Sequence, residues 1–436
     1  MAASQDIAEP VAADASWTAL RRVAANASWL TLNQALSYIL PLVTTPILTR
    51  GFGPDVYGVY STGLAYGAYV ALLVTYGFNY YGPRAIALSR ADRPAIQRIY
   101  AAILTVQAAL GLTGLAVLCV VLSFTHLDRL VVIVDIVLIT QAALTAATPL
   151  WLFVGLERLR AVSLVQVAAR LALFAATIAL VRRPTDLLPL AVAMLVIAGG
   201  SLLYTLRQAR RAIGGSFPLR KSAVYEVLAE GAPFFWSSVA VSAYASSAII
   251  VVSAVLGPGA AGYFALADKL RVAAVSLTSP MTQAVYPLFN KMAHANSSAP
   301  GDLRVRRVFV VAMLVAGGAS SLAMFWFAAD IIRLLGGHAF GPTILLLRIM
   351  SPVPLIIGLS NILGRQTLIP WGHVRLFTRI TFVTAAVGVL SIGGFLYALG
   401  LTGAAWSVLV VESFVTIALA VGAGRKGLLR WAFGIV

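Results

Sequence analysis

The amino-acid sequence predicts an all-α polytopic membrane protein with about twelve transmembrane helices, arranged as two six-helix parallel repeats around a central cavity. The prediction rests on long apolar segments, on positive charge that alternates from loop to loop, and on a turn motif that recurs in both halves. Hydrophobic residues make up 60% of the 436 residues and charged residues only 11%. This composition excludes a soluble domain of useful size.

The apolar segments are long enough to cross a membrane, because a helix needs about 20 residues to span a hydrocarbon core about 30 Å thick. They are continuously apolar and do not alternate with period two, so helices rather than a β-barrel are expected. The expected spans are roughly 27–49, 57–78, 99–122, 131–154, 162–181, 187–206, 232–255, 262–288, 308–328, 343–364, 377–398 and 401–422.

Positive charge is concentrated in every second loop of the chain. Of the 32 Lys and Arg residues, 23 lie in the N-terminal tail and in every second loop after it, and seven lie in the opposite loops and span mouths. Basic residues accumulate on the cytoplasmic side of inserted helices. The split therefore predicts a multi-pass protein with both termini in the cytoplasm. It also explains most of the net charge of +17 without a nucleic-acid partner.

The longest polar stretch divides the chain into two halves, each with six expected spans. The expected organisation is a disordered cytoplasmic tail at 1–20, an N-terminal six-helix bundle at 21–206, a cytoplasmic linker at 207–230, a C-terminal six-helix bundle at 231–424 and a cytoplasmic tail at 425–436.

A short motif recurs at the first external turn of each half. It reads Gly53-Pro54-x-x-x-Gly58-x-Tyr60 in the first half and Gly257-Pro258-x-x-x-Gly262-x-Phe264 in the second. Halves with the same orientation imply parallel repeats related by an axis along the membrane normal, with a central cavity between them. The second copy also satisfies G-x-G-x-x-G, but no soluble βαβ unit surrounds it, so a nucleotide site is not expected.

No catalytic constellation is present in the sequence. The four histidines are far apart, Cys119 is the single cysteine, and no H-E-x-x-H, G-x-S-x-G or Walker A motif occurs. We therefore expect no catalytic residue, no metal site and no cofactor. Without a P-loop, active transport must draw on an ion gradient or on downstream consumption of the product.

Charged residues inside the spans are the main functional candidates, because a charge at the bilayer centre costs about 2.5–3.5 kcal/mol. Arg170 is near the middle of the fifth span and Arg348 is in the tenth, and both are expected to line the cavity. A structural ion pair is the alternative for Arg170, and snorkelling is the alternative for Arg348. Lys269 or Arg271, in the eighth span, is also expected to face the cavity.

The acidic residues near these cations are candidates for charge balance or ion coupling. Asp268 neighbours Lys269, and the two side chains point to different helix faces. Glu412 either pairs with a cavity arginine or couples transport to protons, and Asp135 is expected at the membrane interface. Cations still outnumber carboxylates in the expected cavity, which predicts an anionic substrate, since arginine binds phosphate and carboxylate in a bidentate manner.

Several strings, in order along nearly the whole chain, resemble bacterial O-antigen and exopolysaccharide flippases. These flippases form the polysaccharide branch of the multidrug/oligosaccharidyl-lipid/polysaccharide exporter superfamily. The sequence departs from many relatives at Gly51-Phe52-Gly53, and Arg271 has no place in the family pattern. The matching strings are Leu40-Pro41 with Pro46-Ile47-Leu48-Thr49-Arg50-Gly51-Phe52-Gly53-Pro54-Asp55-Val56-Tyr57-Gly58, Tyr76-Gly77-Phe78-Asn79 with Pro83-Arg84-Ala85-Ile86-Ala87, Gly262-Tyr263-Phe264-Ala265-Leu266-Ala267-Asp268-Lys269-Leu270, Leu347-Arg348-Ile349-Met350-Ser351-Pro352 with Ser360-Asn361-Ile362-Leu363-Gly364-Arg365-Gln366, and Gly403-Ala404-Ala405-Trp406 with Glu412.

The resemblance implies a flippase of the bacterial inner (plasma) membrane. Its substrate would be a polyprenyl-diphosphate-linked oligosaccharide, moved to the outer leaflet by alternating access for surface polysaccharide synthesis. Arg170, Lys269 and Arg348 would contact diphosphate or acidic sugar. Arg84 would act at the cytoplasmic mouth and Arg50 at the exit. A polysaccharide polymerase or export machinery would be a partner.

Two other functions remain open from the sequence. A cation-coupled multidrug exporter of the same superfamily would line its cavity with carboxylates, whereas arginines outnumber carboxylates here. A membrane glycan polymerase or glycosyltransferase would need a long loop with catalytic residues. The longest loop offers only Glu226 and Glu230 among basic neighbours.

Overall fold

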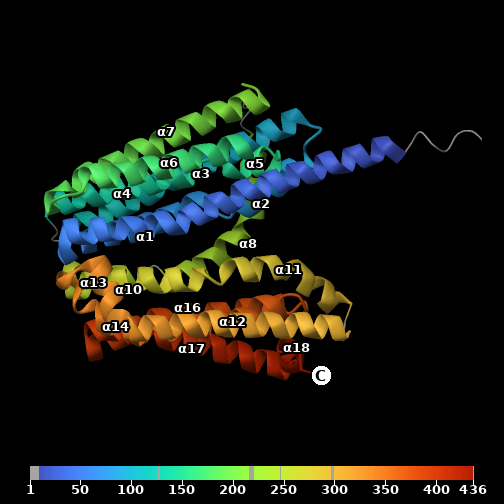
Figure 1. Ribbon diagram of the computed structural model, residues 1–436. Helices are drawn as coiled ribbons and strands as arrows, with labels where there is room; N and C mark the ends of the chain where they lie inside the picture. Colours follow the sequence, from blue (N-terminus) through green and yellow to red (C-terminus); the bar gives the residue numbers. More distant parts are fainter. Residues whose placement is uncertain (1–8, 125–127, 216–219, 246, 296–298, 436) are drawn as a thin grey trace, which may run out of the picture.

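The structure is a computed structural model that describes residues 9–124, 128–215, 220–245, 247–295 and 299–435 (Figure 1). Within these residues the regular structure is helical throughout and no strand occurs, so the predicted all-α fold class is confirmed. The N-terminal half holds α1 (Glu9–Thr75), α2 (Phe78–Leu88), α3 (Arg93–Ser123), α4 (Arg129–Ala146), α5 (Leu150–Gly155), α6 (Leu159–Leu180), the short 3-10 helix η1 (Pro184–Asp186) and α7 (Leu187–Ile213).

The C-terminal half follows the same plan with more interruptions. Its elements are α8 (Lys221–Ala245), α9 (Ser247–Leu256), α10 (Pro258–Ser276), α11 (Ser279–His294), α12 (Pro300–Trp326), α13 (Ala328–Gly336), the 3-10 helix η2 (His338–Phe340), α14 (Thr343–Met350), α15 (Val353–Leu363), the π-helical turn η3 (Gly364–Leu368), α16 (Val374–Leu399), α17 (Leu401–Arg425) and α18 (Leu429–Ala432).

The chain crosses the molecule twelve times over the described residues. Nine helical stretches are long and apolar enough to span a membrane by themselves. The first of them contains Gly53, whose φ of 70° interrupts the helix, so this stretch supplies two spans. The pairs α8–α9 and α10–α11 each supply one further span from two shorter helices. The predicted number of about twelve spans is therefore confirmed.

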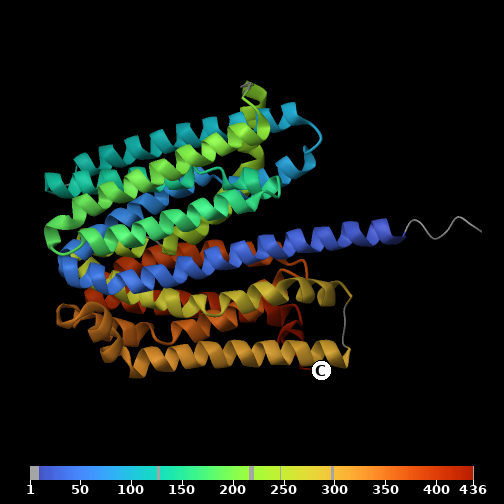
Figure 2. The same cartoon turned by 45° about the horizontal axis from the view of Figure 1, so that its top comes forward.

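The two halves form two lobes, coloured blue to green and yellow to red in Figure 1. Their ribbons lie close together at the end that carries Gly53, α13 and the start of α10, and they diverge toward the opposite end. The first is termed the closed end here. The second is termed the basic end, because α7 ends there with Arg210 and Arg211. Figure 2 shows α1 lying along the C-terminal lobe, where it packs against α10.

A hydrophobic core shared by both lobes fastens the closed end. Phe52 and Tyr57 from α1 pack with Leu266 and Phe340 from the C-terminal lobe, and each of these side chains is at most 2% exposed. The Tyr57 and Phe340 rings meet edge to face, with their centroids 5.8 Å apart. Burial of aromatic side chains supplies much of the stability of such contacts.

The boundaries of the lobes differ in part from the predicted segments. Residues 9–20 belong to α1 instead of a disordered tail, in keeping with the high helix propensity of their alanines, whereas residues 1–8 lie outside the described part of the chain. The predicted linker is mostly helical, because α7 runs to Ile213 and α8 begins at Lys221. Val227, inside that segment, is buried in the core of the N-terminal lobe.

The C-terminal residues after α17 are packed in place, although a tail was predicted there. Arg306 of α12 is 1% exposed, and its guanidinium carbon lies 4.7 Å from the centre of the Trp431 ring. The same side chain donates a hydrogen bond from Nη1 to the Trp431 carbonyl at 3.0 Å, and Arg307 Nε donates to the Gly434 carbonyl at 2.7 Å. Two adjacent arginines thus hold α18 against α12.

Candidate functional site

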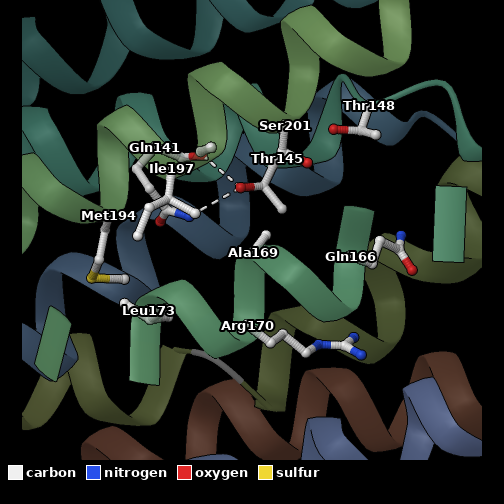
Figure 3. Close-up of a pocket in the computed structure, with 11 residues that line it drawn as sticks. Gln141, Thr145, Thr148, Gln166, Ala169, Arg170, Leu173, Met194, Ile197 and Ser201 are labelled. Atoms are coloured by element: carbon white, nitrogen blue, oxygen red, sulfur yellow. Dashed lines mark hydrogen bonds between the residues drawn. The ribbon is translucent and has the colours of Figure 1, made fainter. Parts of the chain in front are cut away.

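The N-terminal lobe holds a cavity of about 200 Å³ between α4, α6 and α7 (Figure 3). Arg170 is half-buried at its edge, and Figure 3 shows the guanidinium group directed away from Thr145 and Ser201. Gln141 donates a hydrogen bond to the Thr145 hydroxyl at 3.0 Å. The polar lining consists of Gln141, Thr145, Thr148, Gln166, Arg170 and Ser201. One arginine among neutral hydroxyl and amide groups gives this cavity a net positive charge.

The C-terminal lobe holds a larger cavity of about 570 Å³, formed by α8, α15, α16, α17 and η3. Tyr80 from α2 closes one side, so residues of both lobes line it. Its charged residues are Arg365 in the π-helical turn and Glu412 on α17. The remaining polar residues are serines, threonines and one asparagine.

A third cavity, of about 160 Å³, lies within the C-terminal lobe and brings together three of the predicted residues. Arg271 forms an ion pair with Asp268 one turn away on α10, with Nη2 at 2.7 Å and Nε at 2.8 Å from Oδ1. Glu412 is 9% exposed and lines both this cavity and the larger one. Arg271 is therefore placed in an ion pair inside the lobe.

Lys269 points to a different side of α10 from its neighbours Asp268 and Arg271. It follows Gly262 by seven residues, about two helical turns, so it lies on the face of α10 that meets α1. The lysine is half-buried and forms no hydrogen bond or ion pair with the described residues. This placement puts one cation between the lobes, below the closed end.

Arg348 and Arg84 lie outside the cavities described above. Arg348 is exposed on α14, on the same face as the exposed Leu345, and the structure does not bring it near Arg170. Arg84 is exposed on α2, one turn beyond Tyr80 toward the basic end. Residues four apart share a helix face, so Arg84 lies beside the rim of the larger cavity.

Arg50 joins the two lobes at the closed end. Its Nη2 donates a hydrogen bond to the Leu334 carbonyl at 2.7 Å, and the neighbouring Thr49 hydroxyl donates to the Leu335 carbonyl. These carbonyls belong to the last turn of α13, where a helix has no internal donors left to offer them. Arg50 therefore caps a helix of the opposite lobe.

Asp135 is buried, which differs from its expected place at the membrane interface. The side chain is 2% exposed on α4, and its Oδ1 has no hydrogen-bonding partner among the described residues. Gly63 of α1 lies against it, since a Cβ there would be 2.7 Å from that oxygen. The buried hydroxyl of Thr62, next to Gly63, also has no partner in this part of the structure. Close packing of α1 on α4 through glycine explains the burial.

Arg365 is a cavity residue that the sequence reasoning assigned to a loop. The residues after Leu363 continue as a π-helical turn before the chain leaves the lobe at Gly372, so Arg365 still faces the cavity. π-helical turns are frequent at functional sites. The sequence feature that could have predicted this position is the spacing of Asn361 and Arg365, which are four residues apart and line the same cavity.

The comparison with known families settles the class of the chain. Residues 23–293 match the family described as "Polysaccharide biosynthesis protein". The chain belongs to this family. The resemblance to polysaccharide flippases seen in the sequence is thereby confirmed.

Two curated relatives match almost the whole length of this chain. Both are named "Putative O-antigen transporter". The protein of Escherichia coli (strain K12) is 27% identical over 388 residues, which is 88% of this chain and 92% of the relative. The protein of Shigella dysenteriae is 28% identical over 386 residues, with 87% and 95% covered.

Solved structures of similar proteins show which fold this chain adopts. An inward-facing multidrug resistance MATE family transporter of the MOP superfamily is similar with a TM-score of 0.71 at 15% identity, covering 91% of this chain and 96% of that one. The lipid II flippase MurJ in its inward closed conformation has a TM-score of 0.73 at 12% identity, with 92% and 89% covered. An outward-facing MATE transporter scores 0.60 at 14% identity, covering 94% and 96%. The chain therefore shares the fold of these transporters.

Proposed function

We propose that this protein is a flippase that moves polyprenyl-diphosphate-linked oligosaccharide repeat units from the cytoplasmic to the outer leaflet of a bacterial inner membrane. Membership of the polysaccharide biosynthesis family, relatives named as O-antigen transporters and a fold shared with MurJ support the substrate class. The carrying observation is that each lobe holds a cavity in which an arginine lies among hydroxyl and amide groups, with Glu412 as the carboxyl group of the C-terminal cavity. The product supplies surface polysaccharide synthesis, with a polymerase or export machinery acting after it.

The basic end faces the cytoplasm in this proposal. The excess of Lys and Arg in the tail and in alternate loops supports that orientation, with both termini inside. The closed end then faces outward, and the structure represents a state open to the cytoplasm. Alternating access requires the closed-end contacts to break while the lobes approach each other at the basic end.

Arg170 and Lys269 contact the anionic part of the substrate later, as it passes between the lobes. Their positions support this role, because Arg170 lines the N-terminal cavity and Lys269 lies on the face of α10 that meets the N-terminal lobe. Arg84 receives the substrate at the cytoplasmic rim. Arg50 acts at the exit by holding the closed end shut. Arg348, exposed outside the cavities, has no role in this conformation.

Asp135 and Glu412 couple transport to a proton gradient. Each is buried within one lobe, and ionisable groups in that position are functional in membrane proteins more often than structural. Asp268 and Arg271 balance each other's charge beside Glu412. Relatives named as transporters and a fold shared with a flippase support a transport role for this chain rather than an enzymatic one.

A cation-coupled multidrug exporter is the second candidate, favoured by the similarity to MATE transporters. The experiment that separates the candidates is a deletion in the native host, followed by extraction of lipid-linked oligosaccharide and a test of its accessibility from outside. Complete repeat units accumulating on the inner leaflet, rescued by wild type and not by Arg170→Gln, support the flippase. Normal outward delivery with reduced drug tolerance supports the exporter. An unpolymerised glycan already facing outward contradicts both and points to an enzyme.

A further inference from the structure

The large C-terminal cavity has the chemistry of a carbohydrate site. Hydroxyl and amide side chains from three helices line it, and its volume of about 570 Å³ lies within the range of about 300–1,000 Å³ seen for ligand pockets. Polar groups recur on the walls formed by α8, α15 and α16, where they lie beside apolar side chains such as Ile357 and Phe377. The polar groups include Ser238, Ser242, Ser360, Asn361, Thr378 and Thr381.

The polar groups are available to a ligand. The half-buried side chains of Ser360, Asn361 and Thr378 have no hydrogen-bonding partner among the described residues. Ser238 and Thr381 donate to carbonyls of their own helices, at 2.9 and 3.0 Å, and their oxygens can still accept. Sugar hydroxyls donate and accept equally well, so they match a wall that offers both kinds of group.

An aromatic pair lies beside these polar groups. The rings of Tyr80 and Phe234 are stacked with centroids 5.5 Å apart and an interplanar angle of 17°. Tyr80 comes from α2 and Phe234 from α8, and they remain 66% and 40% exposed. Exposed aromatic faces offer an apolar surface on which the C–H face of a sugar ring can lie.

Charge is arranged along the depth of the cavity. Glu412 and Leu419 line the same wall seven residues apart on α17, about 10 Å along the helix axis, with Glu412 farther from the basic end. Arg365 is exposed at the rim nearer the basic end and has no hydrogen bond or ion pair with the described residues. The cavity therefore has a cationic rim and an interior of hydroxyl, amide and apolar groups that ends at one carboxyl group.

We propose that the C-terminal cavity binds the sugar part of the lipid-linked substrate, and that Arg365 at its rim binds the diphosphate of the carrier. The proposal rests on the flippase function given above. The prenyl chain holds the diphosphate near the membrane surface, so the sugar extends from the rim into the cavity. A guanidinium group matches a phosphate with two parallel hydrogen bonds.

The test is equilibrium binding to the purified full-length protein in lipid nanodiscs. The probes are a ten-carbon prenyl diphosphate carrying one neutral disaccharide, the same prenyl diphosphate without sugar, and the free disaccharide. Wild type should bind the complete probe more tightly than either part. Arg365→Gln should weaken binding of both diphosphate probes by about tenfold or more, the loss expected for one charge-assisted contact.

The controls separate a local effect from a general loss of charge or fold. Arg379 is an exposed cation near the start of α16 that does not line the cavity. Arg379→Gln should therefore leave binding unchanged. Asn361→Leu and Thr378→Val should remove the gain that the sugar gives over the bare prenyl diphosphate, while binding of the bare probe persists. Because the disaccharide is neutral, the diphosphate is the only anionic group of the probe that Arg365 can bind.

Two results would overturn the inference. Equal losses for Arg365→Gln and Arg379→Gln would show that only bulk charge matters. Equal losses for the sugar-bearing and bare probes in Asn361→Leu would show that the cavity does not hold the sugar. If wild type binds the complete probe, the flippase proposal stands after either of these results. If wild type binds none of the probes, both proposals are contradicted.

Discussion

Gly58 and Gly262 lie against each other's helices in a reciprocal contact at the closed end. A Cβ on Gly58 would overlap the Pro258 carbonyl oxygen, and a Cβ on Gly262 would overlap the Pro54 carbonyl oxygen. The recurring Gly-Pro-x-x-x-Gly motif therefore pairs with its own copy. Each glycine permits the first turn of one helix to touch the first turn of the other, so the two lobes pack backbone to backbone at that end.

Alanine at either glycine should open the closed end. Overpacking of a tight contact costs about 1–3 kcal/mol, enough to shift a balanced equilibrium toward the outward-open state. Spin labels at Arg182→Cys and Leu399→Cys, in a Cys119→Ser background, report the separation of the lobes there. Gly58→Ala should lengthen the measured distances, and Gly200→Ala, a helix glycine with no neighbour within 4 Å, should not. Identical distances for all three proteins would contradict the contact's proposed role.

Removal of the Arg50 side chain should loosen α13. Arg50 and Thr49 supply the donors for the last carbonyls of α13, and no donor within that helix can replace them. Hydrogen exchange of residues 328–337 should become severalfold faster in Arg50→Ala, as expected for the loss of about 1 kcal/mol in one exposed, charge-assisted bond. Arg182→Ala, at the same end, provides the comparison. Unchanged exchange in Arg50→Ala would show that the bond contributes nothing.

Asp135→Asn should abolish the coupling of transport to a proton gradient without lowering the stability of the fold. Burial of a carboxyl group without a partner is costly, so the neutral amide of the same shape should unfold at the same temperature or higher. Transport by this variant should no longer respond to a proton gradient. The exposed Asp128, just before α4, provides the matched variant Asp128→Asn, which should respond as wild type does. A full gradient response in Asp135→Asn would remove this residue from the coupling mechanism.

The pair formed by Asp268 and Arg271 should behave as a structural unit. Arg271→Met leaves the Asp268 carboxylate without its ion-pair partner at a site where both side chains are at most 15% exposed, and should destabilise the fold by about 3 kcal/mol. The double variant Asp268→Asn with Arg271→Met should recover most of that loss. Thermal unfolding in detergent measures both. Additive losses in the double variant would mean that the two charges act independently.

Much of this fold follows from patterns that sequence alone contains. Apolar length and alternating charge predicted the spans, and the Gly53 and Gly257 motifs predicted their turns, because glycine with a positive φ is required at both. Arg170 was predicted to line a cavity because a lone arginine in the middle of an apolar span has few other uses. The structure places it at the edge of a cavity formed by α4, α6 and α7 within the N-terminal lobe.

The remaining site residues depend on helix rotation and on helix breaks, which the sequence does not specify. Arg348 was expected in the cavity, but α14 is a short helix whose buried face carries Leu346 and Leu347, so Arg348 is on the outside. Arg365 faces a cavity only because the chain continues as a π-helical turn past Leu363. Asp135 is buried because Gly63 lets α1 approach α4, and a contact between distant segments cannot be seen in either segment alone.

The central claim is that this protein moves lipid-linked sugar by means of cationic side chains, among them Arg170 of the N-terminal cavity. Purified protein in liposomes, with a fluorescent short-chain prenyl-diphosphate disaccharide and an impermeant quencher outside, tests it directly. The account predicts flipping by wild type, a loss of about tenfold or more in Arg170→Gln, and near-normal flipping in Arg348→Gln. No flipping by wild type above protein-free liposomes, or equal rates in wild type and Arg170→Gln, would contradict it.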